Sequence, residues 1–339
     1  MKSEVFNMDC MEGMREFADS VHHIDNIEGM AQLHEKCANL IISDPPYYRV
    51  KGDFDFDFAD FEEYKTMMRK QAKAYKRILA DNGTLFVYGS AKNIAYVQVI
   101  FDEYFNLENN ITIEFNRQTK KGVYEFRCFA PVTERLLMYS NEINRTGLEE
   151  IKLDVNNFKP LRQYFKELQG FIGLNLKRIN ETLGHRKAEH CFYHSSTQWD
   201  MPTVETYNEL IKVYKINEWS GFREYEGLRQ EYEGLRQEYE GLRRPFNNFM
   251  GLFDVMNFNQ EAHITTNYDH DTVKPETLTR ALILTCSRVD DLVVIPFSGS
   301  GTECAMAKKE KRNYIGFDNV LKYVEMSNKR CEAIQPELF

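Results

Sequence analysis

Several features that define common classes of protein are missing or scarce in this chain of 339 residues. No apolar run approaches the roughly 20 residues that a membrane-spanning helix needs, and the first residues lack the basic-then-apolar profile of a signal peptide. The seven cysteines are odd in number and form no Cys-x-x-Cys pair, which indicates neither a disulfide framework nor a zinc site. We therefore expect reduced thiols, no metal, no membrane partner and a cytoplasmic location.

Basic charge is also in short supply, since 43 Lys and Arg residues stand against 52 Asp and Glu residues and give a net charge of −9. A net charge describes the whole surface, however, and a protein that binds nucleic acid needs only one basic face. The acidic excess is concentrated in residues 53–63 and in repeats after Glu224, whereas basic residues gather elsewhere. The charge balance therefore does not exclude a nucleic-acid partner.

The pattern of apolar residues predicts an α/β fold. Strands are expected at 5–8, 38–42, 84–88, 110–115, 134–139, 291–295 and 313–317. Helices are expected at 59–81, 93–104, 277–286, 302–311 and 320–334, and the first of them is expected to end in an αL turn at Asn82-Gly83. Strands that alternate with helices predict a mostly parallel sheet that is covered on both faces.

The segment between the two α/β blocks, about 150–222, has a different character. Short helices are expected at 160–172, 175–183 and 204–213, with Gly173 and Gly184 between them. Short helices with tight turns and a basic centre are compatible with a helix-turn-helix-like module. An insert whose Lys and Arg residues only face solvent explains the same pattern.

Three near-identical heptads follow at 223–243. Their Tyr and Leu residues alternate by three and four positions, which is the spacing of a coiled-coil seam. Each heptad also contains a Gly, which costs about 0.8–1 kcal/mol relative to Ala in a helix. We therefore expect a marginal helix that needs a partner surface and ends at Arg244-Pro245. A spacer, a homodimer contact and a contact with a nucleic-acid backbone are the open interpretations.

The stretch Ser43-Asp44-Pro45-Pro46-Tyr47 directly follows the predicted strand at 38–42. Open α/β sheets bind ligands at the carboxyl ends of their strands. Two prolines remove two backbone donors and stiffen the chain, while their carbonyls still accept hydrogen bonds. The Asp44 carboxylate, the Pro45 carbonyl and the Tyr47 ring would form a rigid corner that suits a planar ring with an exocyclic amino group. A turn in which Tyr47 only packs explains the same residues.

A second candidate site lies between the strand at 291–295 and the helix at 302–311. Its residues are Phe297, Ser298, Gly299, Ser300, Gly301 and Thr302. Glycines let the backbone approach a ligand closely, and the helix N-terminus offers N–H groups to a carboxylate or phosphate. Asp318 ends the next strand, where a carboxylate can accept hydrogen bonds from ribose hydroxyls. This pattern is shared by nicotinamide enzymes and S-adenosylmethionine enzymes.

Taken together, these motifs resemble the amino-directed DNA methyltransferases, which methylate adenine N6 or cytosine N4. Asp44-Pro45-Pro46-Tyr47 resembles their catalytic motif, and Phe297-x-Gly-x-Gly-Thr resembles their S-adenosylmethionine motif. The catalytic motif precedes the cofactor loop, as in the β group of the family. The resemblance implies a Rossmann-like, mostly parallel sheet with permuted motif order and a helical insert.

Further motifs of the family extend the resemblance to about two-thirds of the chain. His270-x-x-x-Lys274-Pro275 is similar to an element that precedes the cofactor loop, and residues 314–318 resemble the ribose-binding strand. Asp9 ends a segment that resembles the opening strand near the cofactor adenine. One departure is Ile295, because the family usually has Asp-Pro-Phe where this chain has Ile-Pro-Phe. The implied division is a catalytic half at 1–145, a target-recognition insert at 150–222, a heptad helix or linker at 223–244 and a cofactor half at 246–339.

The implied reaction is transfer of a methyl group from S-adenosylmethionine to adenine N6 in double-stranded DNA, after the base has been flipped out of the duplex. Asp rather than Ser before the prolines favours adenine, and cytosine N4 methylation or a catalytically weak DNA-binding protein are the alternatives. No Cys follows a Pro, which argues against covalent methylation of cytosine C5. We expect a protein of bacterial or phage origin. No nuclease motif is evident, so any restriction endonuclease that acts with it would be a separate protein. Expected DNA contacts are Arg117, Lys120, Lys121, Arg127, Lys177, Arg178, Arg186 and Lys187.

Overall fold

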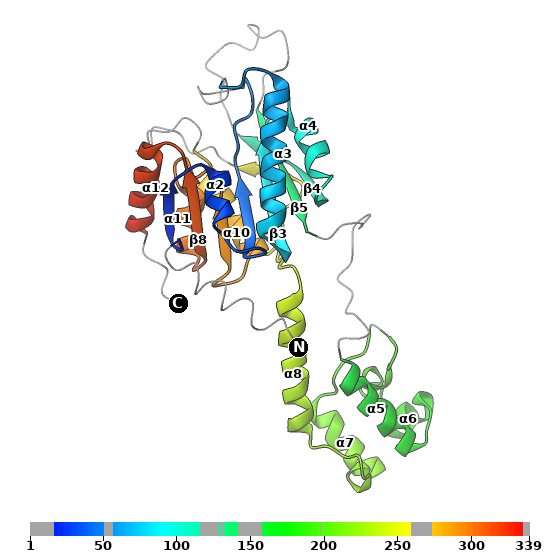
Figure 1. Cartoon of the computed structure of the whole chain (residues 1–339). Coiled ribbons are helices and arrows are strands. Elements are labelled where there is room, and N and C mark those ends of the chain that lie inside the picture. The colour runs from blue at the N-terminus through cyan, green and yellow to red at the C-terminus, as the bar shows by residue number, and fades with distance from the viewer. Residues whose placement is uncertain are drawn as a thin grey trace. The chain divides into compact units, whose positions relative to one another are not determined.

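The computed structural model describes residues 17–50, 57–115, 129, 132–141, 158–196, 198–258 and 273–334. The chain divides into two compact units (Figure 1). Unit 1 is formed by Met1–Arg145 and Arg244–Phe339, and unit 2 by Thr146–Arg243. The strand expected at 5–8 lies outside the described residues.

Unit 1 is built on an eight-stranded sheet with the order β1-β8-β7-β2-β3-β5-β4-β6. The strands are Ser20–His23 (β1), Ala38–Ser43 (β2), Leu79–Gly89 (β3), Asn106–Phe115 (β4), Thr133–Ser140 (β5), Val255–Phe258 (β6), Leu292–Ile295 (β7) and Asn313–Asp318 (β8). Among the described strands only β5 runs antiparallel to its neighbours, β3 and β4. The expectation of a mostly parallel sheet is confirmed. The short strands β1 and β6 were not expected, since four residues are too few to show a period.

Helices cover both faces of this sheet, as the alternation of strands and helices predicts. The helices are Asn26–Ala31 (α2), Phe61–Ile78 (α3) and Ile94–Phe101 (α4) on one face, and Glu276–Cys286 (α10), Thr302–Lys309 (α11) and Leu321–Ala333 (α12) on the other. Each face has its own apolar core. Tyr64, Met68 and Tyr75 of α3 lie in the first core, and Leu278 and Leu282 of α10 lie in the second. Burial of these side chains is the main stabilisation of the sandwich.

The expected end of α3 was wrong. The helix ends at Ile78, because the Leu79 N–H donates to the Tyr75 carbonyl while Leu79 itself is already extended, with φ −69° and ψ 126°. The chain then enters β3 directly, so that Asn82 and Gly83 lie within this strand. Gly83 does not have a positive φ, and the expected αL turn is not formed. Its missing side chain instead makes room for Leu79, whose Cδ1 lies only 2.6 Å from where a Cβ of Gly83 would be.

Unit 2 is helical, as its sequence predicts. Its α-helices are Lys159–Ile172 (α5), Leu176–Leu183 (α6), Val204–Tyr214 (α7) and Tyr225–Leu242 (α8). Gly173 and Gly184 end α5 and α6 in the left-handed conformation, with φ 70° and 72°. Such caps satisfy carbonyls at a helix end, and they explain why the two glycines separate these helices.

The helix expected at the heptads is α8, and its first half packs on the core of unit 2. Leu228 is fully buried, and Tyr225, Tyr232 and Leu235 contact the same core. Leu242, at the equivalent position of the last heptad, is 60% exposed. The partner surface that this helix needs is therefore supplied by its own unit over the first two heptads.

Among the described residues, no helix combines the length and apolar character needed to cross a membrane. The described cysteines with free thiols are Cys37, Cys191, Cys286, Cys304 and Cys331, all buried. In the same part of the chain, no group of three His, Cys, Asp or Glu side chains is placed to hold a metal ion.

Candidate active site

Three strand ends and one strand start meet at the same edge of the sheet. Asp44 follows β2, residues 296–300 follow β7, and Asp318 ends β8. Because β5 is antiparallel, its beginning at Thr133 and Glu134 reaches this same edge. A cavity of about 850 Å³ opens here, within the range of small-molecule sites. Residues from all four segments line it.

Lys274 joins Asp44, after β2, to Glu134 of β5 inside this cavity. Its ammonium lies 3.1 Å from Asp44 Oδ2 and 2.9 Å from Glu134 Oε2, and its side chain is only 6% exposed. The ammonium also stands over the ring of Tyr88, 4.4 Å from the centroid. Removing a charge from water is costly, and partners of this kind offset that cost. Lys274 therefore fixes the two carboxylates at a defined separation.

Burial and ion pairing have opposite effects on the pKa values of Lys274 and Asp44. Burial lowers the pKa of Lys274, but Asp44 and Glu134 together outweigh it and leave the pKa raised. Burial raises the pKa of Asp44, and the charge of Lys274 opposes that rise while Glu134 adds to it. Burial, followed by the charge of Asp44, raises the pKa of Tyr47. Lys274 thus opposes the rise in the pKa of Asp44 that burial causes, and so favours the ionised form.

Tyr47 is held with its hydroxyl on this cluster. The hydroxyl donates to Asp44 Oδ1 and accepts from Lys274 Nζ at 3.0 Å. Asn93 donates from Nδ2 to the carbonyls of Tyr47 and Tyr48, which anchors the loop to the start of α4. The ring of Tyr48 instead packs on Phe61, with centroids 5.1 Å apart. Tyr47 therefore lines the cavity, whereas Tyr48 supports its wall.

The glycine loop is shaped by its own packing as well as by its place at the cavity. Gly301 has φ +73°, and a Cβ there would lie 2.7 Å from Cα of Ser327 in α12. Gly299 has φ 47°, and its N–H donates to Asp318 Oδ2 at 2.9 Å. Asp318 Oδ1 accepts from the N–H of Val320 at 2.9 Å. Asp318 consequently braces the loop while it lines the cavity.

The cavity wall carries polar atoms that have no partner within the described structure. Ser90 Oγ, Ser298 Oγ and Glu303 Oε1 are buried without a hydrogen bond, and all three residues line the cavity. Buried polar groups are almost always paired in folded proteins. Atoms of this kind beside a strand-end cavity fit a polar ligand with several donors, and the site suits an adenosyl amino acid of the expected kind.

Most of the expected site residues meet at this cavity. Those that line it are Asp44, Pro45, Pro46, Tyr47, Lys274, Phe297, Ser298, Gly299, Ser300 and Asp318. Pro275 caps α10, and Thr302 is buried and accepts a hydrogen bond from Arg330 at 2.7 Å. Ile295 is 1% exposed within the apolar core. Asp9 and His270 lie outside the described residues.

Four residues of the site were not expected from the sequence. Glu134 is the second residue of β5, and nothing in the sequence distinguishes it from an ordinary polar residue at the start of a strand. It reaches the site because β5 runs antiparallel to its neighbours. Tyr88 lies at the end of a predicted strand and Asn93 at the start of a predicted helix, and neither belongs to a motif that indicates a functional role. Glu303 carried a signal, because a carboxylate directly after Gly-x-Gly-Thr in an otherwise apolar turn is unusual for a buried position.

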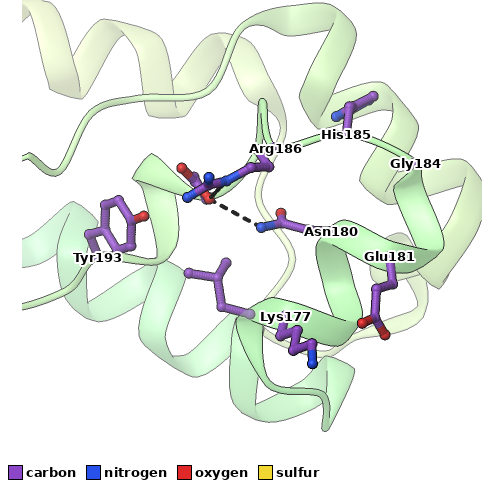
Figure 2. A pocket seen from close by; sticks show the side chains of 9 residues that line it. Lys177, Asn180, Glu181, Gly184, His185, Arg186 and Tyr193 are labelled. Carbon is purple, nitrogen blue, oxygen red and sulfur yellow. Dashed lines mark hydrogen bonds and ion pairs between the residues drawn. The ribbon is translucent and has the colours of Figure 1, made fainter.

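Unit 2 has a shallow hollow of about 580 Å³ of its own, beside the expected basic residues of α6 (Figure 2). Arg186 donates from Nε to Glu189 Oε2 at 2.7 Å, and Asn180 donates to the same oxygen at 3.1 Å. Lys177, Arg178, Arg186 and Lys187 are exposed. The other expected DNA contacts, Arg117, Lys120, Lys121 and Arg127, lie outside the described residues.

The doubly wound sheet, with a cavity at its strand ends, has the α/β fold of known methyltransferase structures. Residues 38–329 match the family described as DNA methylase (N6_N4_Mtase), and the chain belongs to that family. It is 24% identical to the type II methyltransferase M.HinfI of Haemophilus influenzae, over 96% of this chain and 71% of that protein. It is 23% identical to the type II methyltransferase M2.DpnII of Streptococcus pneumoniae, over 92% and 88%.

Two solved structures share the fold. The PvuII DNA methyltransferase, described as cytosine-N4-specific, superposes with a TM-score of 0.52 at 14% identity, covering 94% of this chain and 88% of that chain. A complex of M1.HpyAVI with SAM superposes with a TM-score of 0.50 at 15% identity, covering 92% and 98%. At such identities the likeness concerns the fold.

Proposed function

We propose that this protein is a site-specific DNA methyltransferase that transfers the methyl group of S-adenosylmethionine to adenine N6 in double-stranded DNA. The observation that carries the proposal is the Asp44 corner, in which Pro45 and the Asp44 carboxylate, paired with Lys274, line a cavity shared with the glycine loop. Membership of the N6/N4 DNA methylase family supports the reaction class.

S-adenosylmethionine, when bound, supplies a methyl group on a positively charged sulfur. The residues that would hold it are those of the loop at 297–300, Glu303 and Asp318. Asp318 accepts hydrogen bonds from the N–H groups of Gly299 and Val320, which holds its carboxylate at the cavity where ribose hydroxyls would donate to it. Ser298 Oγ and Glu303 Oε1 offer two further polar contacts.

The lone pair of an exocyclic amino group is delocalised into the base, so the nitrogen is a weak nucleophile. Asp44 accepts from Tyr47 and is paired with Lys274, yet a carboxylate has about four acceptor sites and retains room for an amino hydrogen. The Pro45 carbonyl accepts the second hydrogen. Two acceptors at fixed positions favour a pyramidal nitrogen whose lone pair is exposed on one side. Positioning and electrostatics account for the catalysis, and Asp44 orients the amino group rather than removing a proton first.

The target base reaches such a cavity only outside the double helix, so base flipping is part of the proposal. The Tyr47 ring would stack on the flipped base, since aromatic rings bind bases by stacking. Unit 2, with Lys177, Arg178, Arg186 and Lys187 exposed, is the proposed target-recognition part. Phosphate contacts would position it, and contacts to base edges would choose the sequence.

Cytosine N4 is the second candidate target, because the PvuII enzyme that shares the fold is described as cytosine-N4-specific. Both amino groups present the same pair of hydrogens to Asp44 and Pro45. Asp rather than Ser before the prolines is the reason for preferring adenine. A DNA-binding protein with weak catalysis is the third candidate, motivated by Ile295 in place of an Asp.

Methyl transfer to DNA from tritiated S-adenosylmethionine tests the proposal, with Asp44→Ala as the control and nucleoside analysis of the product. We expect label in N6-methyladenine for the wild type and background label for the variant. Label in N4-methylcytosine would contradict the adenine assignment. Label equal to that of Asp44→Ala would contradict the enzymatic function.

The relatives carry the name type II methyltransferase, so we also propose the modifying role of a restriction–modification pair. The endonuclease would be a separate protein. Protection of host DNA from a cognate restriction enzyme after expression of this chain is the corresponding test, and unprotected but methylated DNA would argue for a solitary methyltransferase.

A further inference from the structure

Glu303 is a buried carboxylate in the cavity wall, and the proposed function assigns it to no particular group of the cofactor. It is the second residue of α11, directly after the glycine loop, and it is 5% exposed. It lines the cavity, and its Oε1 has no hydrogen-bond partner within the described structure. A carboxylate so placed is costly unless a ligand completes its hydrogen bonds.

The charges around Glu303 leave an excess of negative charge at the cavity. Asp44, Glu134 and Glu303 are three carboxyl groups, and Lys274 is shared between the first two. Arg330 acts on Glu303 from α12, but its guanidinium is paired with Glu276 at 2.6 Å. Within the described structure Glu303 Oε1 has no hydrogen-bond partner, and a cationic ligand with N–H donors can supply one.

Burial raises the pKa of Glu303 to about 7, Asp44 adds to that rise, and Lys274 and Arg330 oppose it. The other titratable groups that face it are the Tyr88 hydroxyl and the Cys304 thiol. A carboxyl group with this pKa is partly protonated at neutral pH and ionises fully when a cation binds beside it.

We propose that Glu303 binds the ammonium of the amino-acid end of the cofactor. An ammonium carries both the positive charge and the N–H donors that Oε1 lacks, whereas a sulfonium has charge without donors. The neutral amino group of a base is served by Asp44 and Pro45 and would leave the charge of Glu303 uncompensated. This inference rests on the proposed S-adenosylmethionine function.

Binding of S-adenosylhomocysteine tests the inference, because this product keeps the ammonium but has a neutral sulfur. Calorimetry would compare it with S-adenosylmethionine and with an S-adenosylhomocysteine analogue in which hydrogen replaces the α-amino group. For Glu303→Gln we expect binding of the first two to weaken about 10- to 100-fold, the range for a hydrogen bond to a charged group, with the analogue unchanged. Glu325→Gln, an exposed carboxylate of α12, is the matched control.

Equal weakening of all three ligands, or no weakening, would overturn the inference, and weakening of S-adenosylmethionine alone would assign Glu303 to the sulfonium. A wild type that binds neither natural ligand would instead overturn the proposed function. Should Glu303→Gln fail to fold, calorimetry of the wild type in buffers of different ionisation enthalpy gives the answer. At pH 7, binding of an ammonium ligand should release protons from the partly protonated Glu303 to the buffer, whereas binding of the analogue should not. Equal proton release on binding of both would overturn the inference.

Discussion

The ammonium of Lys274 lies 3.1 Å from the carboxylate of Asp44, although 230 positions separate them in the chain. The sequence suggested a cofactor role for Lys274, within the His-x-x-x-Lys-Pro element. In the structure it lines the cavity and also contacts Asp44, Glu134 and Tyr47. We infer that Lys274 is a positioning residue that lowers the pKa of Asp44 against burial and holds its carboxylate at the cavity.

Replacing Lys274 by Met is expected to move the acidic limb of the pH–rate profile to higher pH. Lys274 lowers the pKa of Asp44 against the effect of burial, so its removal lets that pKa rise further. Asp44 is then protonated at a pH where the wild type is ionised, and a neutral carboxyl group is a weaker acceptor for the amino hydrogen than a carboxylate. Two carboxylates left close together without a cation should also reduce the free energy of unfolding by about 3–5 kcal/mol.

The profile of kcat/KM against pH measures this shift, and Lys274→Arg should restore most of the wild-type profile because it retains the charge. Lys73→Met, an exposed lysine of α3, controls for the loss of a surface charge. A lower rate with an unmoved acidic limb would mean that Lys274 contributes packing only.

Removal of the Tyr47 hydroxyl tests the second contact to Asp44. Tyr47→Phe retains the ring that would stack on the base, so KM for DNA should change little. It deletes the donor to Asp44 Oδ1, and a hydrogen bond to a charged group contributes about 1.5 kcal/mol, which corresponds to a fall in kcat of roughly tenfold. Single-turnover methylation gives the rate constant of methyl transfer separately from binding and product release, with Tyr96→Phe, an exposed tyrosine of α4, as the control. A change confined to KM would contradict this division of roles.

The sequence predicts those parts of the site that consist of consecutive residues, and it does not predict those that depend on how distant strands pair. The corner at Asp44 and the loop at 297–302 are each a few consecutive residues after an apolar strand, and both were found. The pairing of β2 with β7, at Leu40 and Val293, brings the two together as the permuted order predicts. Glu134 could not be found in this way, because its arrival depends on β5 running antiparallel among parallel strands.

The heptads show a similar division between local and tertiary information. The spacing of Tyr and Leu predicts a helix, and α8 is that helix. Because the repeats are nearly identical, they cannot show that Leu228 is buried while Leu242 is exposed. This difference depends on which residues of the rest of unit 2 pack against each leucine. The end of α3 was misjudged for the same reason, since Asn82-Gly83 is a turn signal that β3 overrides.

Leu228 and Leu242 offer a matched test of what α8 does. Leu228→Ala should reduce the free energy of unfolding of unit 2 by about 2–5 kcal/mol, as for other buried leucines. Leu242→Ala, at the same heptad position, should change it by less than about 0.5 kcal/mol. Urea unfolding followed by tryptophan fluorescence isolates unit 2, because Trp199 and Trp219 both lie there and the chain has two tryptophans. A large effect of Leu242→Ala that depends on protein concentration would indicate a homodimer contact instead.

Gly301 and Gly234 are expected to respond to alanine with opposite signs. At Gly301 a positive φ costs an L-residue roughly 1–2 kcal/mol, and the contact with the Ser327 backbone adds to that. At Gly234, inside α8 with no atom within 4 Å of an added Cβ, alanine should stabilise the helix by about 0.8–1 kcal/mol. Thermal unfolding by circular dichroism measures the first change and tryptophan fluorescence the second. Destabilisation at Gly234 would mean that the heptad glycines serve a close contact.

The basic residues of unit 2 can be separated from merely solvated ones by the salt dependence of DNA binding. Each phosphate contact contributes about 0.9 to the slope of log K against log salt. Lys177→Gln with Lys187→Gln should therefore lower the slope by roughly 1.8 if both contact phosphates. Lys166→Gln with Lys212→Gln removes the same charge from exposed positions on α5 and α7 and should leave the slope nearly unchanged. Arg186, already paired with Glu189, is expected to contribute less than the two lysines. Equal slopes for both double variants would mean that these lysines act only through net charge, and the recognition surface would then have to lie elsewhere on the chain.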